Sequence, residues 1–248
     1  MGAGKQPAPA PVAPGVPGHP LDSPTWAALT GPHRHLAEVR GAAARYHPAI
    51  GPFAALAGGP ETTDPSAWAD LAGLAGPDGP AVLFGAEPAA PAGWQLVEQV
   101  HGIQLEGSAV APGHSAALDP AFVELGAADV PDMLDLVQRT RPGPFRRCTH
   151  ELGRYLGVRH AGALVAMAGE RMRPPGWTEI STVCTDPAHR GRGLAGQLVR
   201  ALVASARERG DTPFLHVAVD NTNAERLYRA MGFTERRRVV FSVLRPPS

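Results

Sequence analysis

The stretch Val183-Cys-Thr-Asp-Pro-Ala-His-Arg190-Gly-Arg-Gly193-Leu-Ala195 decides how the second half of this chain folds. A short apolar strand runs through a proline turn into a glycine-rich helix start. Gly191 and Gly193 have no side chains, so their backbone N–H groups can converge on an anion that also faces the positive end of the following helix. Arg190 adds a forked set of donors suited to a pyrophosphate. The pattern predicts a phosphate-binding turn between a strand and a helix.

An apolar stripe follows the turn and predicts the helix. Its members recur at spacings of three and four residues, which places them on one face, and they are Leu194, Ala195, Leu198, Val199, Leu202, Val203 and Ala206. Gly210 is expected to end the helix. Residues 213–219 are apolar and partly β-branched, and they predict the next strand.

The sequence of this turn, taken alone, also allows other interpretations. Residues 191–196 satisfy G-x-G-x-x-G and Asp220 follows the next apolar run, so a dinucleotide-binding Rossmann oxidoreductase is one alternative. However, residues 186–190 separate the strand from the first glycine, and too little chain follows for the other strands of a doubly wound sheet. A plain glycine-rich turn before a surface helix is another alternative. The segment downstream separates these interpretations.

A second motif stands about thirty residues downstream, and the two segments together resemble the GNAT superfamily of acyl-CoA-dependent N-acyltransferases. The family's phosphate signature is Arg or Gln, two residues, Gly, one residue, and then Gly or Ala, which matches Arg190, Gly193 and Ala195. The family pattern Asn-x-x-Ala-x-x-Leu-Tyr-x-x-x-Gly-Phe matches Asn221, Ala224, Leu227, Tyr228, Gly232 and Phe233. The resemblance covers about residues 120–244. It is closest to the FR47-like branch, which shares the strand at 179–185 and a Pro-Gly-Pro-Phe loop like that at 142–145.

The resemblance implies an α/β (α+β) GNAT fold, in which a mixed, mostly antiparallel sheet is flanked by helices. It also implies transfer of an acetyl group from the cosubstrate acetyl-CoA to a primary amine. Direct attack in a ternary complex is the mechanism we expect, because Cys184 is not placed to form an acyl-enzyme. The cofactor-binding residues implied are Val183, Cys184, Thr185, Arg190, Gly191, Arg192, Gly193, Leu194, Ala195, Asn221, Ala224 and Tyr228. A non-catalytic sensor that binds acyl-CoA is the alternative from another functional class.

Such a transferase must remove a proton from its acceptor, because an amine with a pKa of about 10 is mostly protonated at neutral pH. Glu179 occupies the strand position where many members of the family carry a general-base glutamate. Period two places Ser181, Val183 and Thr185 on the same face of the strand. The alternative is an exposed glutamate at a strand start.

Tyr228 matches the family's general acid, which protonates the leaving thiolate of coenzyme A, whose pKa lies near the roughly 8.5 of simple thiols. The alternative is a tyrosine that only packs its ring against the cofactor or the core. Asn221 stands just before the same helix, where its side chain is expected either to cap the helix or to contact the cofactor.

Cys184 raises the question of a ping-pong mechanism through an acyl-enzyme. Period two points it away from Glu179, and no histidine is obviously placed to lower its pKa, so we expect a small buried hydrophobic residue. The resemblance puts an oxyanion donor at a strand N–H near Val183 or Cys184. Cys148 and Cys184 have no metal-ligand spacing, and no metal is expected.

The composition bounds the class of protein. The chain has 248 residues, a formal net charge of zero and a pI near 7.2, so no general attraction to nucleic acid or membrane is expected. No window approaches eighteen consecutive apolar residues. We therefore expect a cytoplasmic protein whose acceptor is a small-molecule amine or an amino acid, with a protein amine and a homodimer left open.

The first half of the chain carries no comparable motif. Residues 1–20 are rich in proline and alanine and predict a disordered tail, and residues 21–115 predict a small α+β domain, with a degenerate half of the GNAT fold as one interpretation. Residues 116–248 would form the transferase domain. The elements expected in the first half are helical structure within 26–46, a helix over 66–75 capped by Ser66, and strands over 81–84 and 94–100.

The expected elements of residues 116–248 follow the GNAT order. They are a strand over 121–125, a helix over 130–138, a hairpin of 154–158 and 163–171, strands over 179–185 and 214–219 with the glycine-initiated helix between them, the Tyr228 helix and a last strand near 238–244. In the superfamily the loop after the first helix lies over the acceptor site. Arg141, Phe145 and Arg146 are therefore candidate substrate contacts, and an arginine would pair with the carboxylate of an amino acid. A surface loop shaped by two prolines is the alternative.

Overall fold

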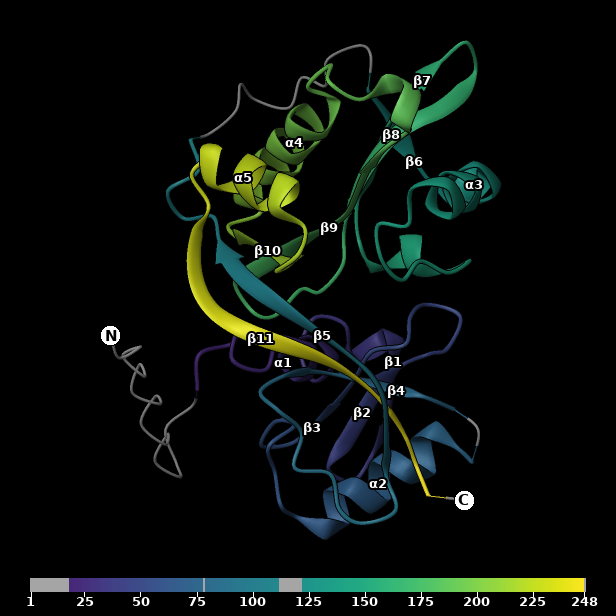
Figure 1. The fold of residues 1–248 in the computed structure, drawn as a ribbon, viewed down its shortest axis with the longest axis vertical. Helices are drawn as coiled ribbons and strands as arrows, with labels where there is room; N and C mark the ends of the chain where they lie inside the picture. Colours follow the sequence, from purple (N-terminus) through teal and green to yellow (C-terminus); the bar gives the residue numbers. More distant parts are fainter. Residues whose placement is uncertain (1–17, 78, 112–121, 248) are drawn as a thin grey trace, which may run out of the picture.

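The computed structural model describes residues 18–77, 79–111 and 122–247 (Figure 1). The expected disordered tail lies almost entirely outside these residues. The strands of the large sheet are β4 (Ala81–Gly85), β5 (Gln95–Glu106), β6 (Phe122–Leu125), β7 (Tyr155–His160), β8 (Ala163–Glu170), β9 (Trp177–Thr185), β10 (Thr212–Ala218) and β11 (Thr234–Arg245).

The large sheet has the order β4-β11-β5-β10-β9-β8-β7-β6. Strands β9 and β10 pair in parallel across the α4 crossover, and the other neighbouring strands pair antiparallel. The expected mixed, mostly antiparallel sheet is therefore confirmed. The Rossmann interpretation is wrong, because a doubly wound fold requires a mostly parallel sheet.

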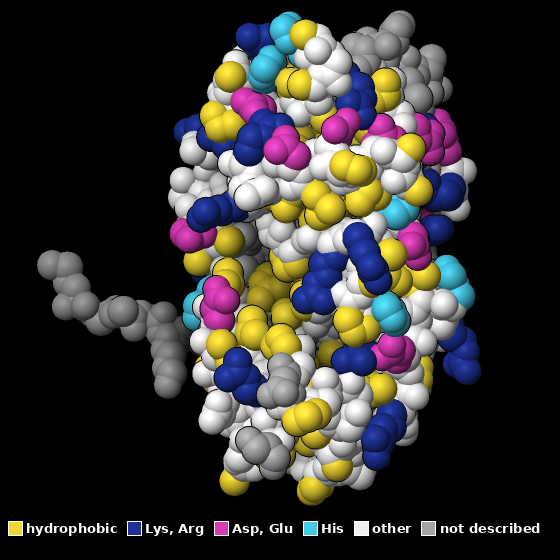
Figure 2. All heavy atoms as spheres, turned by 90° about the vertical axis from the view of Figure 1, so that its right-hand side faces the viewer, with side chains coloured by type: hydrophobic (Ala, Val, Ile, Leu, Met, Phe, Trp, Pro, Cys, Tyr) yellow, Lys and Arg dark blue, Asp and Glu magenta, His cyan; other side chains and the backbone are white. Residues whose placement is uncertain are grey.

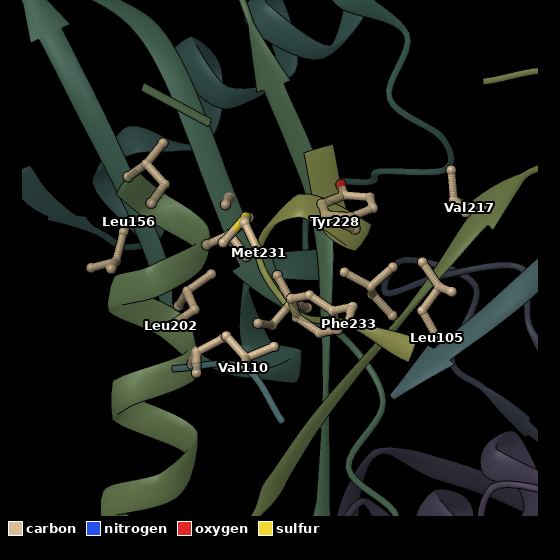
Figure 3. Packing of buried hydrophobic residues seen from close by; sticks show 14 of the residues in the cluster. Leu105, Val110, Leu156, Leu202, Val217, Tyr228, Met231 and Phe233 are labelled. Carbon is tan, nitrogen blue, oxygen red and sulfur yellow. The ribbon is translucent and has the colours of Figure 1, made fainter. Parts of the chain in front are cut away.

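Helices cover both faces of this sheet (Figure 1). On one face, α4 (Leu194–Glu208) and α5 (Thr222–Ala230) pack in a hydrophobic cluster with inward-facing residues of β9 and β10, among them Ile180, Leu215 and Val217. On the other face, Met133 and Leu136 of α3 (Val130–Thr140) pack against β7, β8 and β9. Figure 3 shows the first cluster, with Leu202 of α4 near Phe233 and Met231.

The N-terminal part contains α1 (Pro24–Leu29), a three-stranded sheet of β1 (Ala37–Arg40), β2 (Ala43–Tyr46) and β3 (Ala54–Leu56), and α2 (Pro65–Ala75). Helical structure within 26–46 is confirmed only in α1 and in the short 3-10 helix η1 (Arg34–Leu36), because residues 37–46 form β1 and β2 instead. The chain turns at Gly31 and Pro32, and Gly41 at φ 46° then lies in the tight turn that joins β1 to β2 in a hairpin.

The cap of α2 also differs from expectation. The side chain of Asp64, and not that of Ser66, caps the helix, because Asp64 Oδ1 accepts a hydrogen bond from the Ser66 backbone N–H at 2.9 Å. Pro65 then occupies the first helical position, where its missing N–H costs nothing. The helix therefore starts one residue before the expected boundary.

Strands β5 and β11 are long and join the two parts of the molecule (Figure 1). They pair antiparallel from Thr234↔Glu106 to Arg245↔Gln95, and β4 pairs with the far end of β11. The expected strand at 94–100 thus continues to Glu106 and lies between β10 and β11. The domain boundary near residue 115 stays a prediction, and the large sheet draws strands from both sides of it.

The remaining elements of the second half appear in the expected order, each within a few residues of its expected bounds. Three short 3-10 helices lie between them, namely η2 (Ala127–Asp129), η3 (Thr149–Leu152) and η4 (Pro187–His189). Within the described ranges, no helix is long and apolar enough to cross a membrane. The cellular compartment stays a prediction.

Candidate active site

Strand β9 carries a bulge that changes which residues share a face. Thr182 has φ 54°, and the pairing with β8 moves from Met167↔Cys184 to Gly169↔Ser181, so β9 contributes one extra residue. Ile180 and Val183 consequently both pack toward α4, whereas Cys184 packs with α3.

The bulge overturns one expectation from strand periodicity. Glu179 alternates with Ile180 and so points away from α4, and Cys184 lies on that same face. The expectation that Cys184 points opposite to Glu179 is therefore wrong, as is the expectation that Val183 shares the Glu179 face. Burial raises the pKa of the Cys184 thiol to about 11, which fits the expected buried hydrophobic residue.

Strands β9 and β10 open apart after a short pairing. Their parallel ladder runs from Thr212↔Trp177 to Phe214↔Glu179, and farther along β9 the residues Ile180, Ser181, Cys184 and Thr185 pair with β8. Tyr228 of α5 lies near Cys184, close enough for the thiol to contribute to the tyrosine pKa. Among the described residues, no strand pairs with β9 beyond Glu179 on the side of β10, so the backbone edge there is unpaired.

A basic cavity of about 280 Å³ lies where β9 passes through η4 into α4. The expected cofactor residues that line it are Thr185, Arg190, Gly191, Arg192, Gly193, Leu194 and Ala195. Gly191 and Gly193 have φ 76° and φ 75°, a conformation that L side chains rarely adopt. His189 and Arg200, which were not among the expected cofactor residues, complete the basic lining.

The charges around this cavity are available to a ligand. Among the described residues, no carboxylate forms a salt bridge with Arg190, Arg192 or Arg200. Arg190 donates from Nε to the Thr185 carbonyl at 3.2 Å, which leaves its terminal nitrogens free for an anion.

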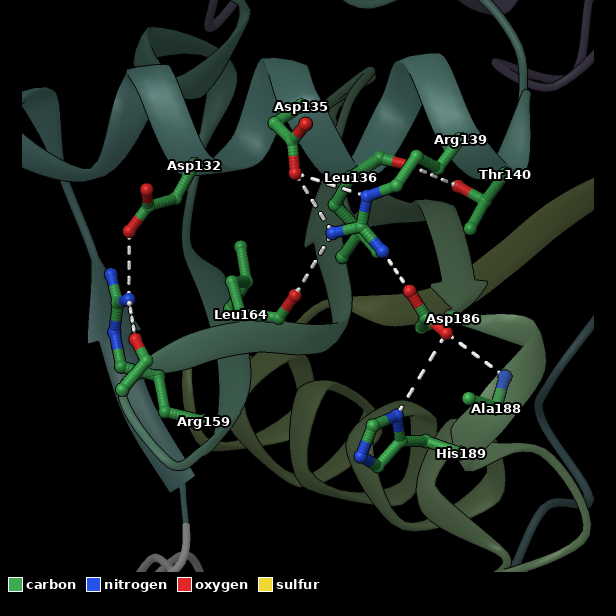
Figure 4. A network of polar contacts seen from close by, with 11 residues as sticks. Asp132, Asp135, Leu136, Arg139, Thr140, Arg159, Leu164, Asp186, Ala188 and His189 are labelled. Atoms are coloured by element: carbon green, nitrogen blue, oxygen red, sulfur yellow. Dashed lines mark hydrogen bonds and ion pairs between the residues drawn. The ribbon is translucent and has the colours of Figure 1, made fainter.

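Figure 4 shows the polar contacts between α3 and the turn that precedes the two glycines. Arg139 in the last turn of α3 pairs with Asp186 and donates to the Leu164 carbonyl at 3.4 Å. Asp186 in turn accepts from the Ala188 N–H at 2.9 Å and caps η4. The ion pair therefore ties the turn before the glycines to the opposite face of the sheet.

Tyr228 is buried on α5, and its ring packs against Phe233 at 6.0 Å between centroids. Figure 3 shows its hydroxyl pointing away from Phe233 and Met231. Burial raises the pKa of Tyr228 to about 12, so the hydroxyl keeps its proton at neutral pH. Asn221 Oδ1 accepts a hydrogen bond from the Ala224 N–H at 3.2 Å. The side chain therefore caps α5, which is one of the two roles expected for it.

Glu179 is completely buried and belongs to a cluster of charges. Its Oε2 accepts from Arg171 Nε at 2.8 Å, and its Oε1 accepts from Arg171 Nη2 at 2.5 Å and lies 2.6 Å from His216 Nδ1. Burial by itself would raise the pKa of Glu179, but the charge of Arg171 and the hydrogen bonds from Arg171 and His216 outweigh it and hold the pKa at about 2.

The cluster continues into the first half of the chain. Gln104 of β5 donates from Nε2 to the Leu21 carbonyl at 3.0 Å and lies 3.1 Å from His216 Nε2. Burial lowers the pKa of His216, so the neutral ring donates to Glu179 from Nδ1 and accepts from Gln104 at Nε2. Neither Arg171 nor Gln104 belongs to a sequence motif, so neither was expected at the site.

The three candidate substrate contacts do not gather at one site. Arg141 is exposed, with φ 49° at the end of α3. Phe145 is buried and meets Tyr155 edge-on at 5.7 Å between ring centroids. Arg146 donates to the carbonyl of Pro48 in the N-terminal part. The loop is therefore held between the α3 core and the first half of the chain.

Comparisons with known proteins agree with this geometry. The FR47-like protein family matches residues 155–242. A solved structure from Novosphingobium aromaticivorans, assigned to the GNAT family of acetyltransferases, is 41% identical and covers 93% of this chain and 100% of that one, with a TM-score of 0.83. A GCN5-related N-acetyltransferase from Kribbella flavida, 17% identical with a TM-score of 0.59, shares the fold over 91% of this chain and 96% of its own.

A curated protein also matches part of the chain. The N-alpha-acetyltransferase RimI of Mycobacterium tuberculosis is 43% identical over 82 residues, which are 32% of this chain and 51% of that protein. The chain thus spans about half the length of this relative. The near-complete match to the Novosphingobium structure, together with the FR47-like match, shows that the chain belongs to the GNAT family of acetyltransferases.

Proposed function

We propose that the protein is an N-acyltransferase that moves an acetyl group from acetyl-CoA to a primary amine by direct attack in a ternary complex. The observation that carries this proposal is the basic cavity at Arg190–Ala195, which lies beside the free edge of β9 and Tyr228. The name of the Mycobacterium tuberculosis relative, an N-alpha-acetyltransferase, supports an amine acceptor.

The residues of the cavity fit the phosphates of coenzyme A. A Cβ placed on Gly191 would meet nothing within 4 Å, so the backbone there faces open space rather than packed side chains. The backbone N–H groups of the turn and the start of α4 would hold a diphosphate, with Arg190, Arg192 and Arg200 as charged partners. When bound, acetyl-CoA supplies the thioester.

Two groups of the chain would act on the reacting atoms. Tyr228 would donate its Oη proton toward the leaving sulfur, and its raised pKa keeps that proton in place beforehand. A backbone N–H near Val183 or Cys184, beside the bulge of β9, would donate to the oxygen that gains negative charge. Both groups lie on elements that frame the opening between β9 and β10.

A second candidate function depends on whether Glu179 can act as the general base. Glu179 occupies the family's base position, but its pKa of about 2 gives it little affinity for a proton, and it is fully enclosed. Proton transfer to it would need the contacts with Arg171 and His216 to rearrange. This observation favours the alternative of a non-catalytic protein that binds acyl-CoA and responds to it.

Turnover separates the two functions. We would measure the release of free thiol from acetyl-CoA with purified protein and a panel of amines, beside calorimetric titration of coenzyme A. Amine-dependent release is expected, and it would establish the transferase. Binding without release from any amine would favour the sensor, and no binding would contradict both.

A further inference from the structure

His189 lines the basic cavity, and the turn around it fixes the position of its ring. Its backbone N–H donates to the Asp186 carbonyl at 2.8 Å, and the Asp186 side chain caps η4. The ring meets that of His160, at the end of β7, at 5.1 Å between centroids. Figure 2 shows histidine and basic side chains close together at the top of the molecule, the end at which Figure 1 draws β7. The His189 ring therefore lies at the cavity among positive groups.

The two ring nitrogens of His189 have different surroundings. Nδ1 is buried, lies 3.8 Å from Asp186 Oδ1 and forms no hydrogen bond with the described residues. Figure 4 shows this nitrogen turned toward Asp186 and the other nitrogen, Nε2, turned away from it. The carboxylate favours a proton on Nδ1, which leaves Nε2 as an acceptor while the ring is neutral. Only the protonated ring can therefore face Asp186 with one N–H and an anion with the other.

The charges around the ring determine when it is protonated. Burial lowers the pKa of His189, and the nearby Arg192, His160 and Arg139 lower it further, so the ring is neutral at pH 7 when the cavity is empty. The other charged side chains at the cavity or beside the ring are Arg190, Arg200 and Asp186. A diphosphate in the cavity would bring negative charge to the ring and raise its pKa.

A second polar atom of the cavity lacks a partner within the described chain. Thr185 Oγ1 is buried and forms no hydrogen bond with the described residues, and Thr185 lines the same cavity. A buried hydroxyl without a partner is costly, and a phosphate oxygen would accept its hydrogen bond. The unused donors of Thr185 and of protonated His189 both favour an anion in this cavity.

We propose that His189 is a further ligand of the coenzyme A phosphates and that it binds them in its protonated form, so that cofactor binding takes up a proton from solvent. This inference rests on the acyl-CoA site proposed above. The proton is added at Nε2, whose N–H then donates to a phosphate oxygen, while the Nδ1 N–H faces Asp186. Cofactor affinity should consequently rise as the pH falls from the higher pKa of the bound ring toward the lower pKa of the free ring.

The first test is calorimetric titration of coenzyme A at pH 6, 7 and 8 with the full chain and with His189→Gln. A phosphate monoester on the cofactor also titrates, with a pKa of about 6, but it does so with both proteins, so the ratio of their Kd values isolates the histidine. We expect His189→Gln to bind about tenfold more weakly than the parent at pH 6 and about equally at pH 8.

His35→Gln is the matched control, because it removes an exposed histidine of the N-terminal part, and it should bind as the parent does at every pH. A ratio of Kd values for His189→Gln and the parent that is the same at every pH would overturn the role of His189 alone. No binding of coenzyme A by the parent at any pH would contradict the acyl-CoA site itself.

The second test follows the proton by NMR and needs no folded variant. The Cε1–H signal of His189 reports the pKa of the ring, with and without saturating coenzyme A. We expect coenzyme A to raise this pKa by about one pH unit, which corresponds to the tenfold change in Kd. The same pKa in the free and the bound protein would overturn the inference.

Discussion

The charged side chains at the two ends of strand β9 differ in whether they have partners within the protein. Beyond its last residue, Arg190, Arg192 and Arg200 surround a cavity, with no carboxylate partner in the described part of the chain. Near its first residue, Glu179 and Arg171 are buried and bonded to each other. Charges left free indicate a place for a ligand, whereas charges satisfied within the protein indicate a structural role. The predictions below test whether these two ends differ in this way.

The largest effect is expected from Glu179→Gln. The substitution leaves the buried Arg171 guanidinium without a counter-charge, so the free energy of unfolding should fall by about 3–5 kcal/mol. Urea denaturation measures it, and the exposed Glu208→Gln is the control, expected within about 0.5 kcal/mol of the parent. Full stability combined with lost turnover would identify Glu179 as a catalytic base and not as a structural ion.

Acid should unfold the protein through the same cluster. Glu179 has a folded pKa of about 2, below the usual 4.5, so its contribution is complete above pH 4.5 and is lost as the pH falls toward 2. Its size is roughly 3 kcal/mol. His216 acts in the same direction below pH 6.5, because its folded pKa is lowered and the unfolded state binds the proton more readily.

Denaturant unfolding at several pH values between 7 and 3 measures this loss. Glu179→Gln should flatten the acid limb, since the variant lacks the titrating carboxylate. An identical pH dependence in the variant would show that other groups control acid unfolding.

Substitutions beside the unpaired end of β9 should lower activity and leave the free energy of unfolding unchanged. Tyr228→Phe is expected to lower turnover roughly 100-fold, the usual contribution of a general acid, while the Kd for coenzyme A stays unchanged. Single-turnover kinetics beside calorimetry separates the two quantities. Unchanged turnover in this variant would show that Tyr228 only packs in the core and does not act as the general acid.

The smallest effect is expected from Arg190→Ala. Loss of one charge-assisted contact to a phosphate should weaken coenzyme A binding roughly tenfold. Stability should not change, because the side chain is exposed. Arg34→Ala removes an exposed arginine of the N-terminal part and should leave the affinity unchanged. Equal affinities in the two variants would exclude Arg190 from the site.

The elements around the cofactor loop were predictable because their signals are local. Gly191 and Gly193 require a left-handed backbone, the apolar stripe of α4 has a helical period, and Asn221 stands at a helix start. Each of these signals depends on a few adjacent residues. Helix α4, strand β10 and helix α5 therefore appear close to their expected bounds.

The contacts of Glu179, near the start of β9, could not be predicted in the same way. The charge cluster around Glu179 draws on separate elements. Arg171, which binds Glu179, follows β8; His216, which also binds it, lies on β10; and Gln104, which contacts His216, lies on β5. Which strands become neighbours depends on the sheet order and not on local sequence. The bulge at Thr182 likewise reverses the faces of the residues after it, and strict alternation could not anticipate that.

Backbone amide NMR during a coenzyme A titration would test the central claim most directly. If the open end of β9 is the cofactor site, the signals of Gly191 and Gly193 should move in a saturable way, because their N–H groups meet the phosphates. The same titration of Arg190→Ala should need more ligand to reach the same shift. Shifts confined to other parts of the chain, with Gly191 and Gly193 unmoved, would contradict the assignment.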